Sequence, residues 1–272
     1  MAHEALAANR MATLAFSISG VQPKWTAHLD LEGDWVVDRG GPWIVKPPNP
    51  LYPYLPELEW LGMRLLEAVG VPVAESGLLP AAEGGWVFLS KRFDLAPNGT
   101  KLAMEDFCQL LGVSEERKYH SSLEKVAHVL LKFSKTPEQD SEYLWKIAVT
   151  SWLIGNADLH LKNLSMLERQ LSPAYDMVPT QLILPSTEEM ALSLCGKRSH
   201  VRRKHWVDDL GQRILQISPV DLTRILGDLS KVESKWSEAL ESAPIPETLK
   251  VQAVEWIQSR WTELFKSPGI FK

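Results

Sequence analysis

The sequence predicts an α+β protein with two lobes, a β-rich N-terminal lobe over residues 1–95 and a helical C-terminal lobe over residues 96–272. Short apolar runs bounded by glycine and proline fill the first part, as in strands. From about Met104 onward, apolar residues recur every three or four positions, as in helices. Of the 272 residues, 45% are hydrophobic and 23% are charged, which is typical of globular domains. This composition excludes a disordered chain, a collagen-like fibre and a coiled-coil rod.

The N-terminal lobe is predicted to contain five strands and one helix. The helix spans Glu57–Val69, where leucines at helical spacing form one buried stripe, and Gly70 follows as a usual C-terminal stop. Pro47 and Pro48 end the third strand, because proline cannot donate a hydrogen bond to a neighbouring strand. The predicted strands are Thr13–Ser19, Lys24–Leu31, Trp43–Lys46, Val71–Leu79 and Trp86–Phe93.

The C-terminal lobe is predicted to be built from helices around one irregular region. That region, Gly155–Thr180, is polar, and it is expected to include a small hairpin around Leu164–Ala174. The sequence has no internal repeat and no low-complexity segment. The predicted helices are Glu124–Phe133, Glu138–Ile154, Trp206–Gln216, Pro219–Leu229, Glu233–Leu240 and Pro246–Lys266.

Charge and cysteine usage argue against several classes of protein. The net charge of −5 is opposite to that of a broadly basic nucleic-acid binder, so no direct DNA binding is expected. The two cysteines, Cys108 and Cys195, cannot form a disulfide framework. No stretch approaches the roughly 18 uninterrupted apolar residues of a membrane helix. We therefore expect a cytoplasmic protein without membrane contact.

The first segment that indicates chemistry is FSISGVQPK, residues 16–24. Its small residues would let backbone N–H groups approach phosphate oxygens, and Lys24 would add a positive charge. Taken alone, the segment fits an ordinary hairpin turn at Gly20 better than a phosphate-binding loop.

The second segment is WIVK, residues 43–46. A lysine at the end of an apolar strand is typical of nucleotide sites in which the amine reaches phosphate oxygens. Glu59 lies on the next predicted helix and is expected to pair with Lys46, as a helix glutamate does in kinases. The alternative is a solvated lysine and a surface glutamate.

The third segment is GNADLHLKN, residues 155–163, followed by Tyr175-Asp176-Met177. The spacing from Asp158 to Asn163 equals that of the kinase catalytic loop, where the aspartate orients the acceptor hydroxyl and the asparagine binds Mg²⁺. Residues five apart point away from each other on a helix, so a shared site requires a loop here. Asp176 would supply a second hard oxygen ligand.

The alternative for this third segment is a helical surface pair of Asp158 and Lys162, with Asn163 as a cap. The order of the segments along the chain favours the kinase interpretation over this alternative, because loop, lysine, helix glutamate, Asp…Asn and Asp occur as in kinases. His160 has no histidine or cysteine at a metal-binding interval and is interpreted as a loop residue.

With these segments the sequence resembles the HipA family of bacterial serine/threonine kinases, the toxins of HipA/HipB-type toxin–antitoxin modules. The resemblance extends over nearly the whole chain. It implies a bilobed protein-kinase-like fold with an all-helical C-lobe, a hinge at about residues 90–94, and ATP and Mg²⁺ as cofactors. It is carried by SISGVQPK, WIVKPP, ELEWLGMRL, FLSKRFD, MEDFCQLLG, GNADLHLKN, SPAYDM and LCGKR.

The resemblance also implies a role for individual residues. Asp158 would be the catalytic base, Asn163 and Asp176 the Mg²⁺ ligands, and Ser17 and Ser19 sites of autophosphorylation that switches the kinase off. The residues implied to bind ATP are Ser19, Gly20, Val21, Gln22, Pro23, Lys24, Lys46, Lys91, Arg92, Phe93, Asp94, His160, Lys162, Asn163, Tyr175 and Asp176.

Within the family, the chain is most similar to HipT, the short toxin of three-component HipBST systems. Only sixteen residues precede Ser17, and the Ser-Ile-Ser motif is HipT-like. The resemblance implies antitoxin partners of HipB or HipS type and an aminoacyl-tRNA synthetase as substrate, the tryptophanyl enzyme before the glutamyl one. The alternatives are an inactive kinase-like module that binds antitoxins, and a small-molecule or lipid kinase.

Overall fold

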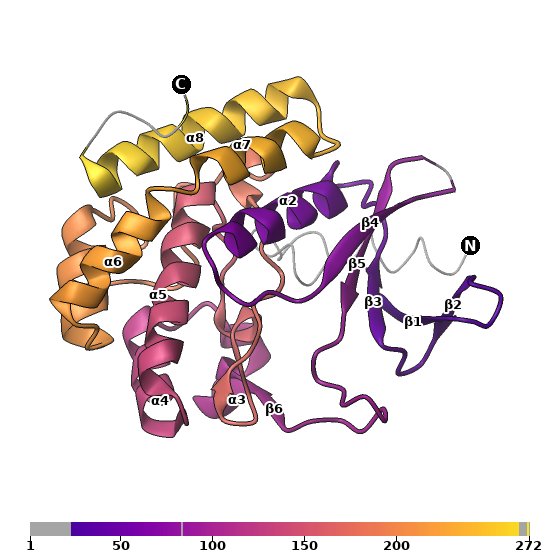
Figure 1. Cartoon of the computed structure of the whole chain (residues 1–272), viewed down its shortest axis with the longest axis horizontal. Helices are drawn as coiled ribbons and strands as arrows, with labels where there is room; N and C mark the ends of the chain where they lie inside the picture. The colour runs from indigo at the N-terminus through magenta and orange to yellow at the C-terminus, as the bar shows by residue number, and fades with distance from the viewer. Residues whose placement is uncertain (1–22, 83, 267–270, 272) are drawn as a thin grey trace.

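The computed structural model describes residues 23–82, 84–266 and 271. A sheet-containing N-terminal lobe lies beside a larger helical lobe, and the two are drawn at the right and left of Figure 1. The predicted strand Thr13–Ser19 falls outside the described residues. Within the described ranges, no helix combines the length and the apolar character needed to cross a membrane.

The N-terminal lobe is a five-stranded antiparallel sheet with the order β2-β1-β3-β5-β4. One strand more than expected forms among residues 24–46, because the chain turns at Gly33, which has a φ of 89°. The Asp30 carboxylate accepts hydrogen bonds from the N–H groups of Glu32 and Asp34 in this turn, both 2.9 Å long. The strands are β1 (Trp25–Leu29), β2 (Trp35–Asp38), β3 (Trp43–Lys46), β4 (Ser76–Pro80) and β5 (Trp86–Lys91).

The strand predicted from Val71 begins five residues later, at Ser76. The intervening backbone pairs with the C-terminal lobe instead. The Ala74 N–H donates to the Ala174 carbonyl at 2.9 Å, and the Ala174 N–H donates to the Pro72 carbonyl at 2.8 Å. This bridge fixes the chain two residues before Asp176 against the N-terminal lobe.

The predicted single helix of this lobe is present as α2 (Leu55–Ala68). It lies between the sheet and the helical lobe and contacts β4, β5, α5 and α7 (Figure 1). Its leucines are buried, as the helical spacing predicted. The Trp236 indole on α7 donates to the Leu65 carbonyl at 2.9 Å, so a buried hydrogen bond joins the two lobes.

The C-terminal lobe is arranged around α5 (Pro137–Ile154), which is buried on nearly all sides from Leu144 onward. It contacts α4, α8 and a π-helical segment, η5. The other helices are α3 (Phe107–Leu110), α4 (Leu123–Phe133), η5 (His205–Ile214), α6 (Pro219–Leu229), α7 (Glu233–Ser242) and α8 (Glu247–Phe265), with short 3₁₀ turns η2 (Glu115–Arg117), η3 (Leu161–Asn163) and η4 (Thr180–Leu182).

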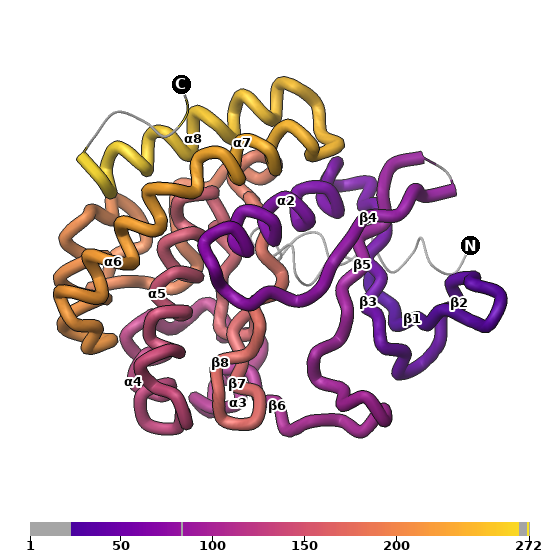
Figure 2. The backbone as a smooth tube through the Cα atoms, in the orientation of Figure 1, coloured from indigo at the N-terminus to yellow at the C-terminus, as the bar shows by residue number. Residues whose placement is uncertain are grey.

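The helical lobe also contains a small antiparallel sheet of three strands, whereas the resemblance implied an all-helical lobe and the sequence pattern indicated only a hairpin. Its strands β6 (Met104–Asp106), β7 (Ser165–Leu167) and β8 (Gln170–Leu171) lie beside α3 in Figure 2. The β7–β8 hairpin confirms the predicted one. Met104–Asp106, expected to be helical, pairs with β7 because the Asp106 side chain caps α3 and delays the start of that helix.

Candidate active site

Lys46, Glu59 and Asp176 form a three-residue ion cluster at the junction of the lobes. The Lys46 ammonium lies 2.7 Å and 2.9 Å from the two oxygens of Glu59, and 2.8 Å from Asp176 Oδ1. The predicted Lys46–Glu59 pair is therefore present. Asp176, far away in sequence, joins it, so strand β3, helix α2 and the segment after β8 meet at one ammonium group.

The pKa values of the two carboxylates in the cluster are shifted in opposite directions. Burial raises the pKa of Glu59 to about 7, although Lys46 opposes the rise. Burial would also raise the pKa of Asp176, but the neighbouring Lys46 charge outweighs it and holds this pKa below its usual value. Burial disfavours the charged form of Lys46, yet the two carboxylates raise its pKa above the usual range. Asp176 is thus the stronger acid and the better ligand for a cation.

The backbone at Asp176 is left-handed, with a φ of 57°. This conformation is unusual for a residue other than glycine and is typical of functional sites, where neighbouring structure holds it in place. On one side, Ala174 is paired with the N-terminal lobe. On the other side, Met177 is fully buried, and its sulfur lies 3.1 Å from the Asn156 amide nitrogen.

Gly62 on α2 permits the close approach of this helix to the Asp176 segment. A Cβ at position 62 would lie 2.0 Å from the Met177 carbonyl oxygen. We expect Gly62→Ala to lower the free energy of unfolding in urea by about 1–3 kcal/mol, because backbone must move. Gly227→Ala on α6 is the matched control, since nothing lies within 4 Å of its Cβ position. It should leave stability unchanged or raise it by up to about 1 kcal/mol. Equal effects of the two substitutions would contradict this explanation.

The segment predicted to be the catalytic loop is a loop in the structure. Helix α5 ends at Gly155, which has a φ of 77°, and a loop follows. The Asp158 N–H donates to the Asn156 side chain at 2.9 Å, and the Asn163 amide donates to the Asp158 carbonyl at 3.1 Å. Lys162 pairs with Asp106 at 3.2 Å, which replaces the alternative of a helical Asp158–Lys162 pair. Asp158 and Asn163 therefore belong to one loop, in which the side chains of Asn156 and Asn163 hold the backbone of Asp158.

Two residues near Asp158 were missed by the sequence analysis. The Tyr119 hydroxyl donates to Asp158 Oδ1. Lys118 is buried, and its charge interacts with those of Asp158, Glu115 and Asp176. Both residues lie in the segment between η2 and α4. Tyr119 precedes Asp158 by 39 residues. No periodicity or spacing in the sequence connects this segment with the loop.

The oxygen donors of Asn163 and Asp176 fit Mg²⁺. No group of three or more His, Cys, Asp or Glu side chains suited to a metal occurs among the described residues. Magnesium, however, commonly uses only one or two protein oxygens and takes its other ligands from water and phosphate. Lys46 contacts Oδ1 of Asp176, and Asn163 uses its amide nitrogen toward Asp158. Asp176 Oδ2 and the side-chain oxygen of Asn163 take no part in these two contacts, and they would be the ligand atoms if the predicted Mg²⁺ bound to these residues.

A hollow of about 600 Å³ lies on the sheet, lined in part by Lys24, Ile44 and Arg92, and none of the three cluster residues lines it. Ile44 precedes Lys46 by two residues on β3, so both side chains project from the same face of the sheet. Burial and the Lys46 charge are the main influences on the pKa values of Glu59 and Asp176. The charge of exposed Lys24 is a smaller influence, and it lowers both pKa values.

The predicted hinge residues lie at the end of β5 and just after it. The N–H groups of Lys91 and Arg92 already donate to backbone carbonyls, at 2.8 Å and 2.7 Å. An adenine contact would therefore use their carbonyls or the Phe93 N–H. The Arg92 guanidinium binds the Asp94 carboxylate through two hydrogen bonds of 2.9 Å and 2.8 Å, which hold the pKa of Asp94 low.

Tyr175 connects the predicted hinge with the loop that contains Lys162. Its ring centroid lies 5.6 Å from that of Phe93, and its hydroxyl contacts the Lys162 carbonyl at 2.7 Å and Ser165 Oγ at 2.6 Å. Burial raises the pKa of Tyr175, so the phenol stays protonated. Pro23, like Lys24, is exposed. Ser17, Ser19, Gly20, Val21 and Gln22 lie outside the described residues.

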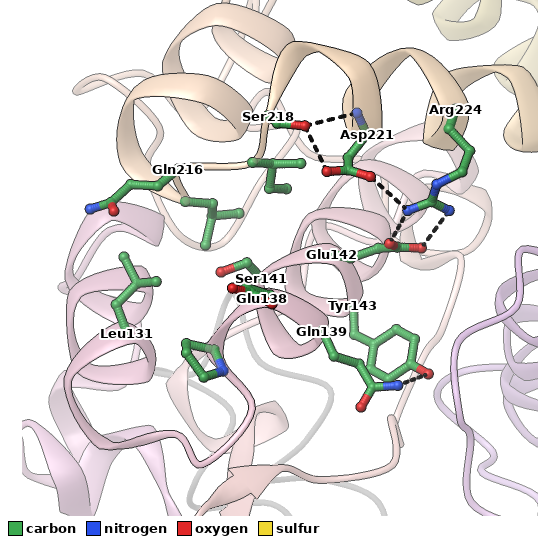
Figure 3. A pocket seen from close by; sticks show the side chains of 13 residues that line it. Leu131, Glu138, Gln139, Ser141, Glu142, Tyr143, Gln216, Ser218, Asp221 and Arg224 are labelled. Carbon is green, nitrogen blue, oxygen red and sulfur yellow. Dashed lines mark hydrogen bonds and ion pairs between the residues drawn. The ribbon is translucent and has the colours of Figure 1, made fainter.

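A larger hollow, of about 820 Å³, lies between the starts of α5 and α6 (Figure 3). Glu142 and Arg224 form an ion pair within it, with 2.6 Å between Oε2 and Nη2. Its described lining residues include no predicted site residue. Size alone therefore does not identify the active site.

We expect His160 to make the stability of the fold depend on pH. Its side chain is buried, and burial together with the Lys118 charge lowers its pKa to about 4. An unfolded histidine titrates near pH 6.5. Between pH 6.5 and 4 the unfolded chain therefore binds a proton that the folded chain does not. As the pH drops from 6.5 to 4, the free energy of unfolding should therefore decrease, by on the order of 3 kcal/mol from this residue.

The measurement is urea unfolding at pH 7 and pH 4.5 for the wild type, His160→Gln and His120→Gln. The difference between the two pH values should be smaller in His160→Gln. The His120→Gln control should behave as the wild type, because His120 is exposed. An unchanged difference in His160→Gln would show that other groups cause the pH dependence.

Comparison with solved structures identifies the class of fold as protein-kinase-like. The chain aligns with HipA in the Shewanella oneidensis MR-1 complex of HipA, HipB and operator DNA, with a TM-score of 0.73 and 20% identity over 92% of this chain and 65% of that one. It also aligns with the Helicobacter pylori proinflammatory kinase CtkA, with a TM-score of 0.58 and 17% identity over 86% of this chain and 88% of that one. At these identities the likeness shows a shared fold.

Residues 16–236 match the family described as the HipA-like C-terminal domain, and the chain belongs to this family. "Putative kinase Y4dM" of Sinorhizobium fredii is 33% identical over 211 residues, which cover 70% of this chain and 51% of that protein. A "Putative kinase" of Haemophilus influenzae is 28% identical over 178 residues, covering 60% and 52%. The chain thus spans about half the length of these curated relatives.

Proposed function

We propose that the protein is an ATP- and Mg²⁺-dependent protein serine/threonine kinase. The observation that supports this proposal best is the buried ion cluster of Lys46, Glu59 and Asp176. The charges of Asp158 and Asp176 both act on Lys118, which relates this cluster to the Asp158 loop. Membership of the HipA-like family and relatives named as kinases support it.

Each residue of the site has a role in this reaction. Lys46 binds phosphate oxygens of ATP, and Glu59 keeps the lysine side chain directed toward them. Asn163 and Asp176 hold Mg²⁺, which when bound neutralises phosphate charge. Asp158 aligns the acceptor hydroxyl and takes up its proton as the γ-phosphoryl group passes from ATP to the hydroxyl oxygen and ADP leaves. Most of the catalysis is therefore positioning and charge stabilisation by a preformed site.

The finer proposal concerns the biological role. HipA in the similar solved structure is part of a toxin–antitoxin complex with HipB. By analogy, this chain acts as the toxin of such a module, resembles HipT, binds antitoxins of HipB or HipS type, and phosphorylates an aminoacyl-tRNA synthetase. The tryptophanyl enzyme is favoured over the glutamyl one. Ser17 and Ser19 are the proposed sites of autophosphorylation, where about two added negative charges each would repel ATP.

The test is incubation of the chain with ATP, Mg²⁺ and each purified synthetase, followed by phosphopeptide mapping. Transfer to one synthetase by the wild type, but not by Asp158→Asn, would support the proposal. Asp208→Asn is the control, because Asp208 is an exposed residue of η5. Bound ATP without transfer to either synthetase or to the chain itself would contradict kinase activity and favour a binding module.

A further inference from the structure

The hydroxyl of Tyr119 contacts the carboxylate that the proposed reaction uses. It donates a hydrogen bond to Asp158 Oδ1, and the exposed fraction of Asp158 is only 9%. A hydrogen bond to a charged, largely buried carboxylate is stronger than an exposed neutral one, and it restrains the orientation of the group. Tyr119 therefore acts directly on the orientation of Asp158.

Tyr119 is itself held by the active-site segments. Its ring meets the His160 ring edge to face, with centroids 5.1 Å apart at 74°. Its carbonyl accepts a hydrogen bond from the Arg198 guanidinium, which also pairs with Glu188 at 3.1 Å. The catalytic loop and the segment after Asp176 thus both fix Tyr119. These contacts are those expected of a side chain that supports the Asp158 carboxylate.

The preceding residue adds charge at the same place. Lys118 is 8% exposed, and its carbonyl accepts a hydrogen bond from Leu161 N–H at 3.3 Å. Its ammonium interacts with the charges of Asp158 and Asp176. The segment therefore brings a cation and a phenol together to the two carboxylates of the site.

From these contacts we propose that Tyr119 is a positioning residue for phosphoryl transfer, acting through Asp158. The phenol holds the carboxylate in the orientation in which it meets the acceptor hydroxyl, and Lys118 offsets the local negative charge. This inference rests on the proposed kinase function. It adds a segment of the chain, residues 118–119, to a site otherwise made of Lys46, Glu59, the catalytic loop and Asp176.

The test compares Tyr119→Phe with Tyr143→Phe, because both remove a single hydroxyl. Tyr143 lies on α5 beside the distant hollow, where its hydroxyl accepts a hydrogen bond of 3.1 Å from Gln139 (Figure 3). Phosphate incorporation into the chain is measured in single turnovers at increasing concentrations of Mg²⁺–ATP. Tyr119→Phe should lower the maximal rate by about 10- to 100-fold, the effect of losing a hydrogen bond to a charged group. The half-saturating ATP concentration should stay within about twofold, and Tyr143→Phe should match the wild type.

A double variant separates positioning from general loss of structure. If Tyr119 acts through Asp158, adding Tyr119→Phe to Asp158→Asn should cause no further loss of rate. A normal maximal rate in Tyr119→Phe would overturn the role of Tyr119, and so would a faster one, which would mean that the phenol blocks the acceptor. A weakened affinity for ATP at an unchanged maximal rate would overturn it too. Absence of transfer by the wild type would instead overturn the kinase function, and the role of Tyr119 with it.

Discussion

Lys46→Met is expected to abolish phosphoryl transfer and to destabilise the fold by about 3–5 kcal/mol at pH 8, the usual cost of breaking a buried ion pair from one side. Glu59 is 1% exposed, and both of its oxygens contact the Lys46 ammonium. Without that ammonium, Glu59 and Asp176 are two carboxylates with no cation between them. The methionine side chain can fill the space of the lysine stem but cannot compensate the charge.

The loss of stability in Lys46→Met should depend on pH in a defined direction. The pKa of Glu59 is raised to about 7 by burial even with Lys46 opposing the rise. Removing Lys46 removes that opposition, so Glu59 takes up a proton more readily as the pH falls. The difference in free energy of unfolding between the variant and the wild type should therefore be larger at pH 8 than at pH 6, as measured by urea unfolding.

Lys91→Met provides the matched control for this prediction. Lys91 also ends a strand of the sheet and pairs with a glutamate, Glu75, at 2.9 Å, but the two side chains are 50% and 64% exposed. An exposed pair of this kind contributes at most about 1 kcal/mol. Similar effects of Lys46→Met and Lys91→Met on stability would show that the buried cluster has no special structural role.

Asp158→Asn is expected to lower the maximal rate of phosphoryl transfer by at least about 10²-fold, in line with the loss of a proton acceptor and its orienting charge. ATP binding should be retained, because Lys46, Asn163 and Asp176 remain in place. Asparagine has the size of aspartate and can still accept the Tyr119 hydrogen bond. Single-turnover transfer and calorimetric ATP binding measure the two properties separately. Equal losses of ATP affinity and of rate would contradict a role confined to the transfer step.

The sequence alone identified the parts of the site that depend on local pattern. Lys46 at the end of a strand, Glu59 beside the apolar stripe of α2, and the Asp158–Asn163 spacing all carry local signals. The structure joins Lys46 and Glu59 with Asp176, and it holds Asp158 and Asn163 in one loop. The β7–β8 hairpin followed from the polar stretch after Asn163 in the same way.

The parts that could not be predicted depend on contacts between distant segments. Tyr119 reaches Asp158 across 39 residues, and the bridge from Val73 to Ala174 joins the two lobes. Strand β6 exists because β7 offers it a partner, which overrides the helical appearance of its neighbours. Nothing in local spacing encodes such pairings, because they follow from how the lobes pack.

The most direct test of kinase activity is the intact mass of the chain before and after incubation with ATP and Mg²⁺. The wild type should gain one or two phosphates, mapped to Ser17 or Ser19, whereas Asp158→Asn should gain none. The starting protein must first be shown to carry no phosphate. A wild-type chain that binds ATP but gains no mass, or an Asp158→Asn variant that gains as much as the wild type, would contradict the role assigned to this site.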